Sequence, residues 1–162
     1  MKRIITILLL TTLFQMQGQI SVGVFADAKL LFIGDGNGND AGTLDLIVLP
    51  KLQNNGVPIF VYPYFEYANL NGGNYIRYAL GVGYGFEVKN ISIEPSIDYG
   101  RIVRWGGAYS SFNGLLEVSY KMRPKTYLSV LNSLTQRNDL AFKWEDKAWR
   151  YNFYFGARYE IY

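Results

Sequence analysis

The chain has 162 residues, 16 Lys and Arg against 13 Asp and Glu, and neither cysteine nor histidine. This length suits one domain. The missing residue types exclude a disulfide framework, a thiolate metal site and a histidine base or metal ligand. The basic residues do not cluster, so we expect no nucleic-acid partner. We predict a protein without cofactor or metal that is not an enzyme.

The first eighteen residues have the pattern of a secretory signal peptide. Lys2 and Arg3 precede an apolar run that ends near Phe14, and the small Gly18 precedes the polar Gln19. The run is shorter than the roughly 20 apolar residues that a membrane-spanning helix needs. We therefore predict a cleaved signal peptide at residues 1–18 and one β-barrel domain at residues 19–162.

Eight segments after the signal have the character of β-strands, and turn or loop residues separate them. In chain order the expected strands are residues 20–32, 43–52, 58–68, 75–88, 91–99, 110–122, 126–135 and 148–162. The segment 58–68 is aromatic on both faces, so its facing is left undetermined. The segment 126–135 has the weakest pattern.

The hairpin over residues 75–99 is the clearest of these elements. From Ile76 to Val88 large apolar side chains alternate strictly with Gly, Ala, Arg or Glu, and Tyr75 shares the face of the second set. A period of two over this length indicates a strand whose faces meet different environments. Lys89-Asn90 forms a tight turn, after which Gly81 is expected to lie opposite Asp98. We expect the space beside this glycine to hold a third side chain, such as an arginine from across a lumen.

The connections alternate in length along the chain. Segments 34–42, 69–74, 105–109 and 136–147 are moderate or long, whereas 53–57, 89–90 and 123–125 are shorter or tight. Eight strands with short turns at one end and longer loops at the other are typical of a bacterial outer-membrane barrel. The sequence therefore predicts an all-β fold: an eight-stranded antiparallel up-and-down transmembrane β-barrel.

Side-chain size indicates which face meets lipid. The polar face is rich in Gly, Ser and Ala with scattered charges, as expected for the narrow interior of an eight-stranded barrel. The apolar face is bulky, and aromatic residues lie towards the strand ends, where membrane barrels have aromatic girdles. The expected girdle residues are Trp105, Tyr109, Tyr120, Tyr127, Trp149 and Tyr159. Arg101 is expected on the outer face, where its long side chain reaches the headgroups.

On these patterns the chain resembles the small eight-stranded outer-membrane barrels of the OmpA/OmpX type. The hairpin 75–99 and the last strand, 151–162, carry the resemblance most specifically. It implies a scaffold in the bacterial outer membrane with a packed polar interior, no wide pore, and surface loops that contact something. Its expected partners are outer-membrane lipid and lipopolysaccharide. The aromatic-terminated last strand also implies recognition by the barrel-assembly machinery.

Charged residues on the polar face should pair in so narrow a lumen, because an unpaired buried charge costs several kcal/mol. We prefer a structural ion-pair plug to a gated ion path. The candidate network is Arg77, Glu94, Asp98, Glu117, Arg150 and Arg158. Further candidates for the lumen are Asp27, Lys29, Asp45, Glu87, Lys121 and Glu160.

The loops offer candidates for contact but little chemistry. Phe142 and Trp144 of the loop 136–147, with Trp149 just after it, form a possible surface contact. The segment 34–40 matches a calcium loop only in part, with Asp40 and Leu46 at two required positions, so we expect a solvated loop.

Three functions remain open. We prefer a non-enzymatic barrel with a plugged lumen, acting in envelope integrity or in loop-mediated contact with an unidentified surface or envelope partner. The alternatives are a soluble exported lipocalin-like carrier of an apolar ligand and a narrow channel for ions or small solutes.

Overall fold

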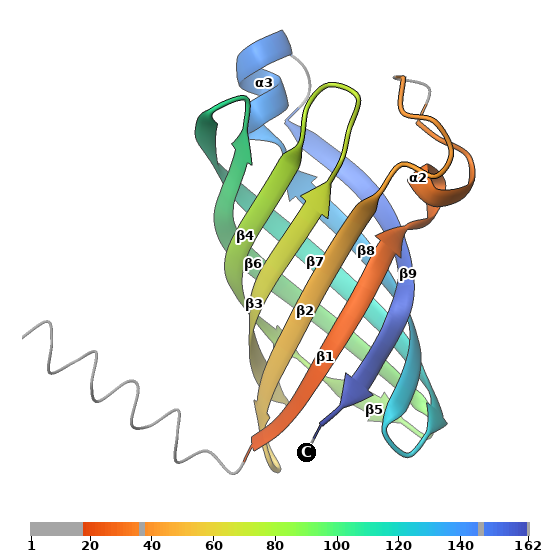
Figure 1. Ribbon diagram of the computed structural model, residues 1–162. Helices are drawn as coiled ribbons and strands as arrows, with labels where there is room; N and C mark the ends of the chain where they lie inside the picture. The colour runs from red at the N-terminus through yellow and green to blue at the C-terminus, as the bar shows by residue number, and fades with distance from the viewer. Residues whose placement is uncertain (1–17, 36–37, 146–147, 162) are drawn as a thin grey trace, which may run out of the picture.

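The computed structural model describes residues 18–35, 38–145 and 148–161. Nine strands and two short helices form the fold (Figure 1). The strands are β1 (Gly18–Asp27), β2 (Asp45–Asn54), β3 (Ile59–Ala68), β4 (Tyr75–Tyr84), β5 (Phe86–Val88), β6 (Ile91–Arg104), β7 (Gly107–Arg123), β8 (Thr126–Gln136) and β9 (Trp149–Glu160). The helices are α2 (Ala28–Phe32) and α3 (Asn138–Trp144). None of the helices in this part of the chain is long and apolar enough to cross a membrane.

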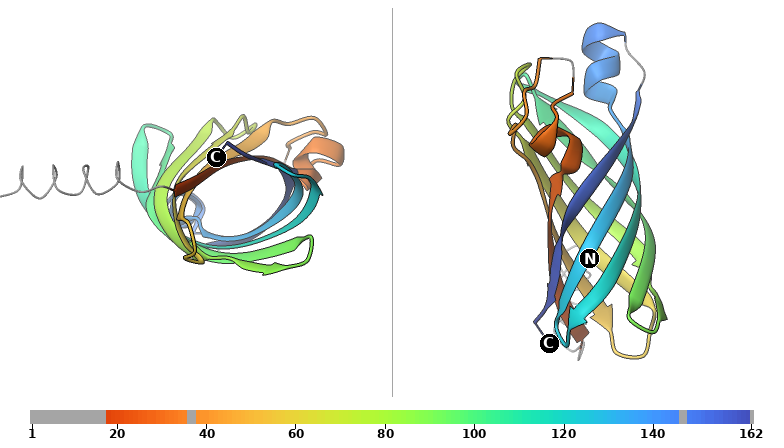
Figure 2. Two further views of the ribbon diagram at one scale, coloured as in Figure 1. Left: turned by 90° about the horizontal axis from the view of Figure 1, so that it is seen from below. Right: turned by 90° about the vertical axis from the view of Figure 1, so that its right-hand side faces the viewer.

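The strands close into a ring. Sequential neighbours pair antiparallel, and β1 pairs with β9, with Val24 opposite Ala157. Strands β4 and β5 both pair with β6 and are interrupted only at Gly85, whose N–H donates to the Pro58 carbonyl. They act as one strand, so the barrel has eight strands and the predicted fold is confirmed. The view along the axis shows the ring (Figure 2, left).

Local structure differs from the sequence prediction at the ends of several strands. The first strand stops at Asp27, because its carboxylate accepts a hydrogen bond from Leu30 N (2.8 Å) and caps α2. Residues 28–32 are therefore helical rather than extended. The expected loop at 105–109 is a two-residue turn, since Trp105 and Gly106 both have positive φ (51° and 74°), as in a type I′ hairpin. The last long loop contains α3.

The two faces of the wall are as the alternation predicts. Leu80, Val82 and Phe86 are exposed, whereas Arg77 is fully buried and Asp98 is 2 % exposed. The exterior is a continuous belt of exposed Leu, Ile, Val, Phe and Tyr side chains. Such an apolar surface is what lipid requires and water disfavours. Tyr127 departs from the prediction, because it is buried in the lumen and donates to Glu160.

The lumen is more aromatic than the sequence pattern suggests. Strand β3 directs Phe60, Tyr62 and Tyr64 inward, which settles its facing. A Cβ at Gly81 would collide with the ring of Tyr62, so this ring fills the space that we expected an arginine to fill. Large residues of β1 and β3 therefore lie over glycines of the neighbouring strands. This packing closes the centre of the barrel.

The two ends of the barrel differ. At the short-turn end lie the 89–90 and 124–125 turns and both ends of the described chain (Figure 1). At the long-loop end, α3 rises above the rim, whereas α2 lies beside the upper wall next to β1 and β9 (Figures 1 and 2). Apart from Gly18, with which β1 begins, the predicted signal peptide lies outside the described residues, and so does Tyr162.

Candidate functional site: the lumen and the long-loop end

Four buried charged residues meet across the lower lumen, and we call them the lower cluster: Lys51, Glu94, Glu117 and Arg158. Lys51 Nζ contacts both carboxylates. Arg158 also contacts both, with 2.5 Å from Nη1 to Glu94 and 3.0 Å from Nη2 to Glu117. The residues come from β2, β6, β7 and β9. They therefore link four strands of the barrel through its centre.

Neighbouring hydroxyl groups complete the lower cluster. Ser92 donates to Glu94 (2.5 Å), and Ser119 donates to Glu117 (2.8 Å) while accepting from Arg158 Nη2 (2.7 Å). Two cations balance two carboxylates, so the cluster is neutral as a whole. A paired and hydrogen-bonded group of this kind is the arrangement in which buried charge is tolerated.

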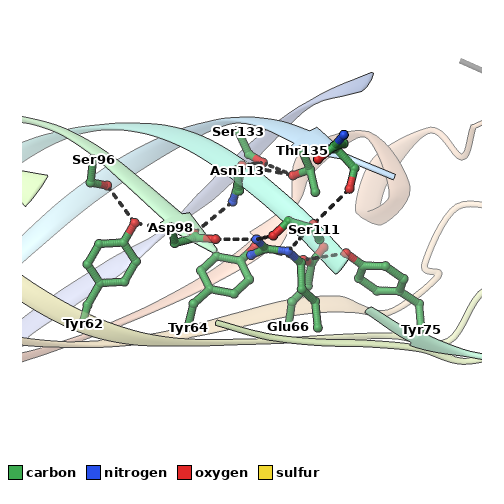
Figure 3. Close-up of polar contacts among 12 residues, drawn as sticks. Tyr62, Tyr64, Glu66, Tyr75, Ser96, Asp98, Ser111, Asn113, Ser133 and Thr135 are labelled. Atoms are coloured by element: carbon green, nitrogen blue, oxygen red, sulfur yellow. Dashed lines mark hydrogen bonds and ion pairs between the residues drawn. The ribbon is translucent and has the colours of Figure 1, made fainter. Parts of the chain in front are cut away.

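A second ion pair lies higher in the lumen. Arg77 contacts Asp98, donates from Nε to Ser111 Oγ (3.0 Å) and stacks over the Tyr64 ring. Asn113 also donates to Asp98 (3.3 Å). The close-up shows Tyr62 and Tyr64 on one wall facing Asp98, Ser111 and Asn113 on the other (Figure 3).

Above this pair, three phenols surround one carboxylate, and we call Glu66, Tyr64, Tyr75 and Tyr154 the tyrosine cage. Glu66 accepts hydrogen bonds from Tyr64 (2.9 Å), Tyr75 (3.2 Å) and Tyr154 (3.0 Å). All four residues are buried. Within the described part of the chain, Glu66 forms no ion pair; its charge is held by hydroxyl groups.

At the rim, one carboxylate fixes the last long loop. Asp139 is fully buried and accepts from Arg137 Nε and Nη2 (2.9 and 2.8 Å). Arg104 Nη1 lies 3.5 Å from the same carboxylate. Burial lowers the pKa of Arg137, but the hydrogen bonds to Asp139 and the nearby charges outweigh this, and the pKa is raised. The cation therefore persists, and α3 is held on the rim.

The anchored α3 presents aromatic side chains to its surroundings. Phe142 is 78 % exposed, and Trp144 and Trp149 are about half exposed. Trp144 packs edge-on against Trp105 at 4.7 Å, and Lys143 Nζ lies 4.0 Å from the Trp105 ring centroid. The three predicted contact residues thus lie exposed at the long-loop end.

The structure brings together most of the sequence-predicted lumen residues. Arg77 pairs with Asp98, and Glu94 and Glu117 share Arg158. Arg150 is half-buried near the upper end of β9 and takes no part in the ion pairs described above. Of the further candidates, Lys29 is exposed on α2, where the alternation of β1 has ended. Glu87 is also exposed, but it pairs with the inward-facing Ser92 and lines the lower mouth of the lumen beside Glu94 and Arg158.

Sequence reasoning missed several partners. Lys51 has the same strand parity as the predicted lumen residue Asp45, which was a usable signal. Glu66 could not be assigned to the lumen from the sequence, because its strand is aromatic on both faces. Arg137 and Asp139 lie in a connection without strand periodicity, where no pattern pointed inward.

In the loop 34–40, which resembles a calcium loop only in part, both Asp35 carboxylate oxygens accept hydrogen bonds from Asn39. Residues 36–37 lie outside the described residues.

These observations define the class of the protein: a closed eight-stranded antiparallel barrel with an apolar exterior and a charged, packed lumen. Similar solved structures have the same fold. The outer membrane protein Ail of Yersinia pestis in a nanodisc matches with a TM-score of 0.60 at 13 % identity, covering 90 % of this chain and all of that one. A de novo designed transmembrane β-barrel matches at 0.53 and 15 % identity, covering 91 % and 98 %. The Neisserial surface protein NspA matches at 0.51 and 11 % identity, covering 88 % and 96 %.

No protein-family model and no curated protein matches the sequence. By its likeness to the solved structures, the chain has the fold of small outer-membrane β-barrel proteins, and its exterior is apolar.

Proposed function

We propose that the protein is a non-enzymatic barrel of the bacterial outer membrane whose plugged lumen makes it a scaffold rather than a pore. The observation that carries this proposal is the lower cluster. Four charged side chains from four strands meet in the lumen, and a passing ion would have to separate them. Eight strands leave an interior only wide enough for side chains. The proposed role is in envelope integrity or in contact at the long-loop end.

Planar-bilayer recording tests the plugged lumen. The purified protein should insert without steady open levels, because the lower cluster and the aromatic rings of β3 fill the bore. Heat-modifiability on a gel should show that the same sample is folded. Steady, reproducible conductance steps from folded protein would contradict the proposal and favour the narrow channel. Recovery of folded protein in the detergent-free aqueous fraction would favour the soluble carrier, although a carrier of that kind directs its apolar face inward.

The anchored α3 supports a contact function at the long-loop end. Asp139 pairs with Arg137 of the same loop and with Arg104 at the end of β6, so the exposed Phe142 and Trp144 are held in place before any partner arrives, which lowers the cost of binding. A strain that lacks this protein can separate the envelope role from the contact role, with resistance to detergent as the measured property. If F142S/W144S restores detergent resistance as well as wild type does, the barrel itself supports the envelope. If this variant reaches the surface but does not restore resistance, the aromatic face is required.

Two further partners follow from the outer surface. Arg101 is exposed on the lipid-facing side near the long-loop end, where its guanidinium can reach lipid or lipopolysaccharide headgroups. The outward residues of β9 include Phe153, Phe155 and Tyr159, an aromatic final strand suited to recognition by the barrel-assembly machinery. Replacing Tyr159 with serine should slow assembly by that machinery, measured as the rate at which the heat-modifiable form appears. An unchanged rate would remove this partner from the proposal.

A further inference from the structure

The short helix α2 leaves three consecutive large apolar side chains uncovered. Leu30 is 7 % exposed and anchors the helix, whereas Leu31, Phe32 and Ile33 are 44 %, 70 % and 78 % exposed. Leu31 and Phe32 are the last two residues of α2 and Ile33 is its C-cap, so the three exposed side chains gather at the C-terminal end of the helix. The acyl chains of membrane lipids can cover such a surface.

The position of α2 beside the barrel shows how these acyl chains would reach it. The helix contacts β1 and β9 beside the upper wall, whereas α3 stands above the rim (Figures 1 and 2). Just below α2, Val24 of β1 and Phe155 of β9 are exposed to lipid. The exposed side chains of α2 therefore continue the apolar belt instead of forming a separate patch.

The strand pairing sets the level of the bilayer boundary on this side. The last pair between β1 and β9 is Asp27 with Tyr154, so β9 has no β1 partner from Trp149 to Phe153. Unpaired backbone groups are not tolerated in hydrocarbon. The acyl region must therefore end near Asp27 and Tyr154, which places α2 at the boundary between acyl chains and headgroups.

We propose that Leu31, Phe32 and Ile33 insert into the outer leaflet and that α2 is an interfacial anchor of the barrel. The occupant of this surface is membrane lipid. Lys29, exposed on the same helix, extends its ammonium group towards headgroup phosphates. The proposal rests on insertion of the barrel as described above, and it adds that one loop at the long-loop end lies in the membrane rather than in water.

Spin labels can measure the depth of α2 directly, because the chain contains no native cysteine. Single-cysteine variants Phe32→Cys and Ile33→Cys report on α2. Leu80→Cys, in the middle of the belt, is the membrane control, and Phe142→Cys, on α3, is the aqueous control. Each labelled protein is reconstituted into dimyristoylphosphatidylcholine bilayers. The measured quantity is the ratio of collisions with molecular oxygen to collisions with a water-soluble nickel complex.

We expect this ratio to be several-fold higher at positions 32 and 33 than at 142, and to approach the ratio at 80. A ratio at 32 and 33 equal to that at 142 would overturn the proposal. Protection at 32 from both relaxing agents would also overturn it, because protein would then cover the helix; dipolar broadening between labels would identify a second copy. If position 80 is itself accessible to the nickel complex, insertion of the barrel into the bilayer is contradicted. This outcome is distinguishable from a result that contradicts insertion of α2 alone.

Discussion

The lower cluster and the tyrosine cage bury carboxylates in the same lumen in two different ways. In the lower cluster, Glu94 and Glu117 each contact Lys51 and Arg158. In the tyrosine cage, Glu66 is held by phenol hydroxyls and by no cation within ion-pair distance in the described chain. The first arrangement depends on equal numbers of opposite charges. The second depends on hydrogen-bond acceptors, whether or not they are charged.

The largest loss of stability is expected from Lys51→Met. The substitution leaves two buried carboxylates with one arginine, and breaking a buried ion pair by removing one partner costs about 3 to 5 kcal/mol. The free energy of unfolding, measured by urea titration in phospholipid vesicles, should fall by that amount. Lys89→Met, at an exposed turn residue, is the matched control and should change it by less than about 0.5 kcal/mol.

A second substitution tests whether lost charge balance causes the loss of stability in Lys51→Met. Adding Glu117→Gln to Lys51→Met removes the excess carboxylate, so the double variant should recover part of the lost stability. If the double variant is as unstable as the sum of the two single variants, packing of the lysine stem accounts for the loss instead.

The tyrosine cage should respond differently to neutralisation. Glu66→Gln keeps a carbonyl acceptor for the phenols and should cost about 1 kcal/mol or less. Glu66→Leu removes the acceptor for Tyr64, Tyr75 and Tyr154, and unsatisfied buried hydroxyls should raise the cost to roughly 2 to 4 kcal/mol. The same urea titration measures both variants. Equal losses for Gln and Leu would mean that the negative charge of Glu66 matters, and the contrast with the lower cluster would disappear.

The sequence was informative where strand periodicity was unbroken. The hairpin 75–99 placed Arg77 and Asp98 on one face because bulky apolar residues alternate there with small, polar or charged ones. The closed barrel itself followed from the number of strand-like segments and the alternating loop lengths. These features are local or repetitive, and a single sequence displays them directly.

Other features depend on tertiary contacts that periodicity does not encode. Strand β3 carries aromatic residues on both faces, so only the closed barrel shows that Tyr64 and Glu66 point inward. In the sequence the alternation of β1 continues through Leu30, but the side chain of Asp27 caps α2 and the chain becomes helical. Asp139 pairs with Arg104, the last residue of β6. Pairing between a loop and a distant strand end leaves no signature in one sequence.

The smallest effect is expected at Asp45, which is buried in the upper lumen with Oδ1 unpartnered among the described residues. Asp45→Asn removes a desolvated charge that gains little from its surroundings, so the free energy of unfolding should stay unchanged or rise by up to about 1 kcal/mol. Asp98→Asn is the matched control on the same inward face, because it breaks the ion pair with Arg77 and should cost about 3 kcal/mol. Urea titration of the two variants side by side measures the difference. If Asp45→Asn were as destabilising as Asp98→Asn, the upper lumen would also depend on charge pairing, and hydroxyl groups alone would not explain how this end of the barrel holds its carboxylates.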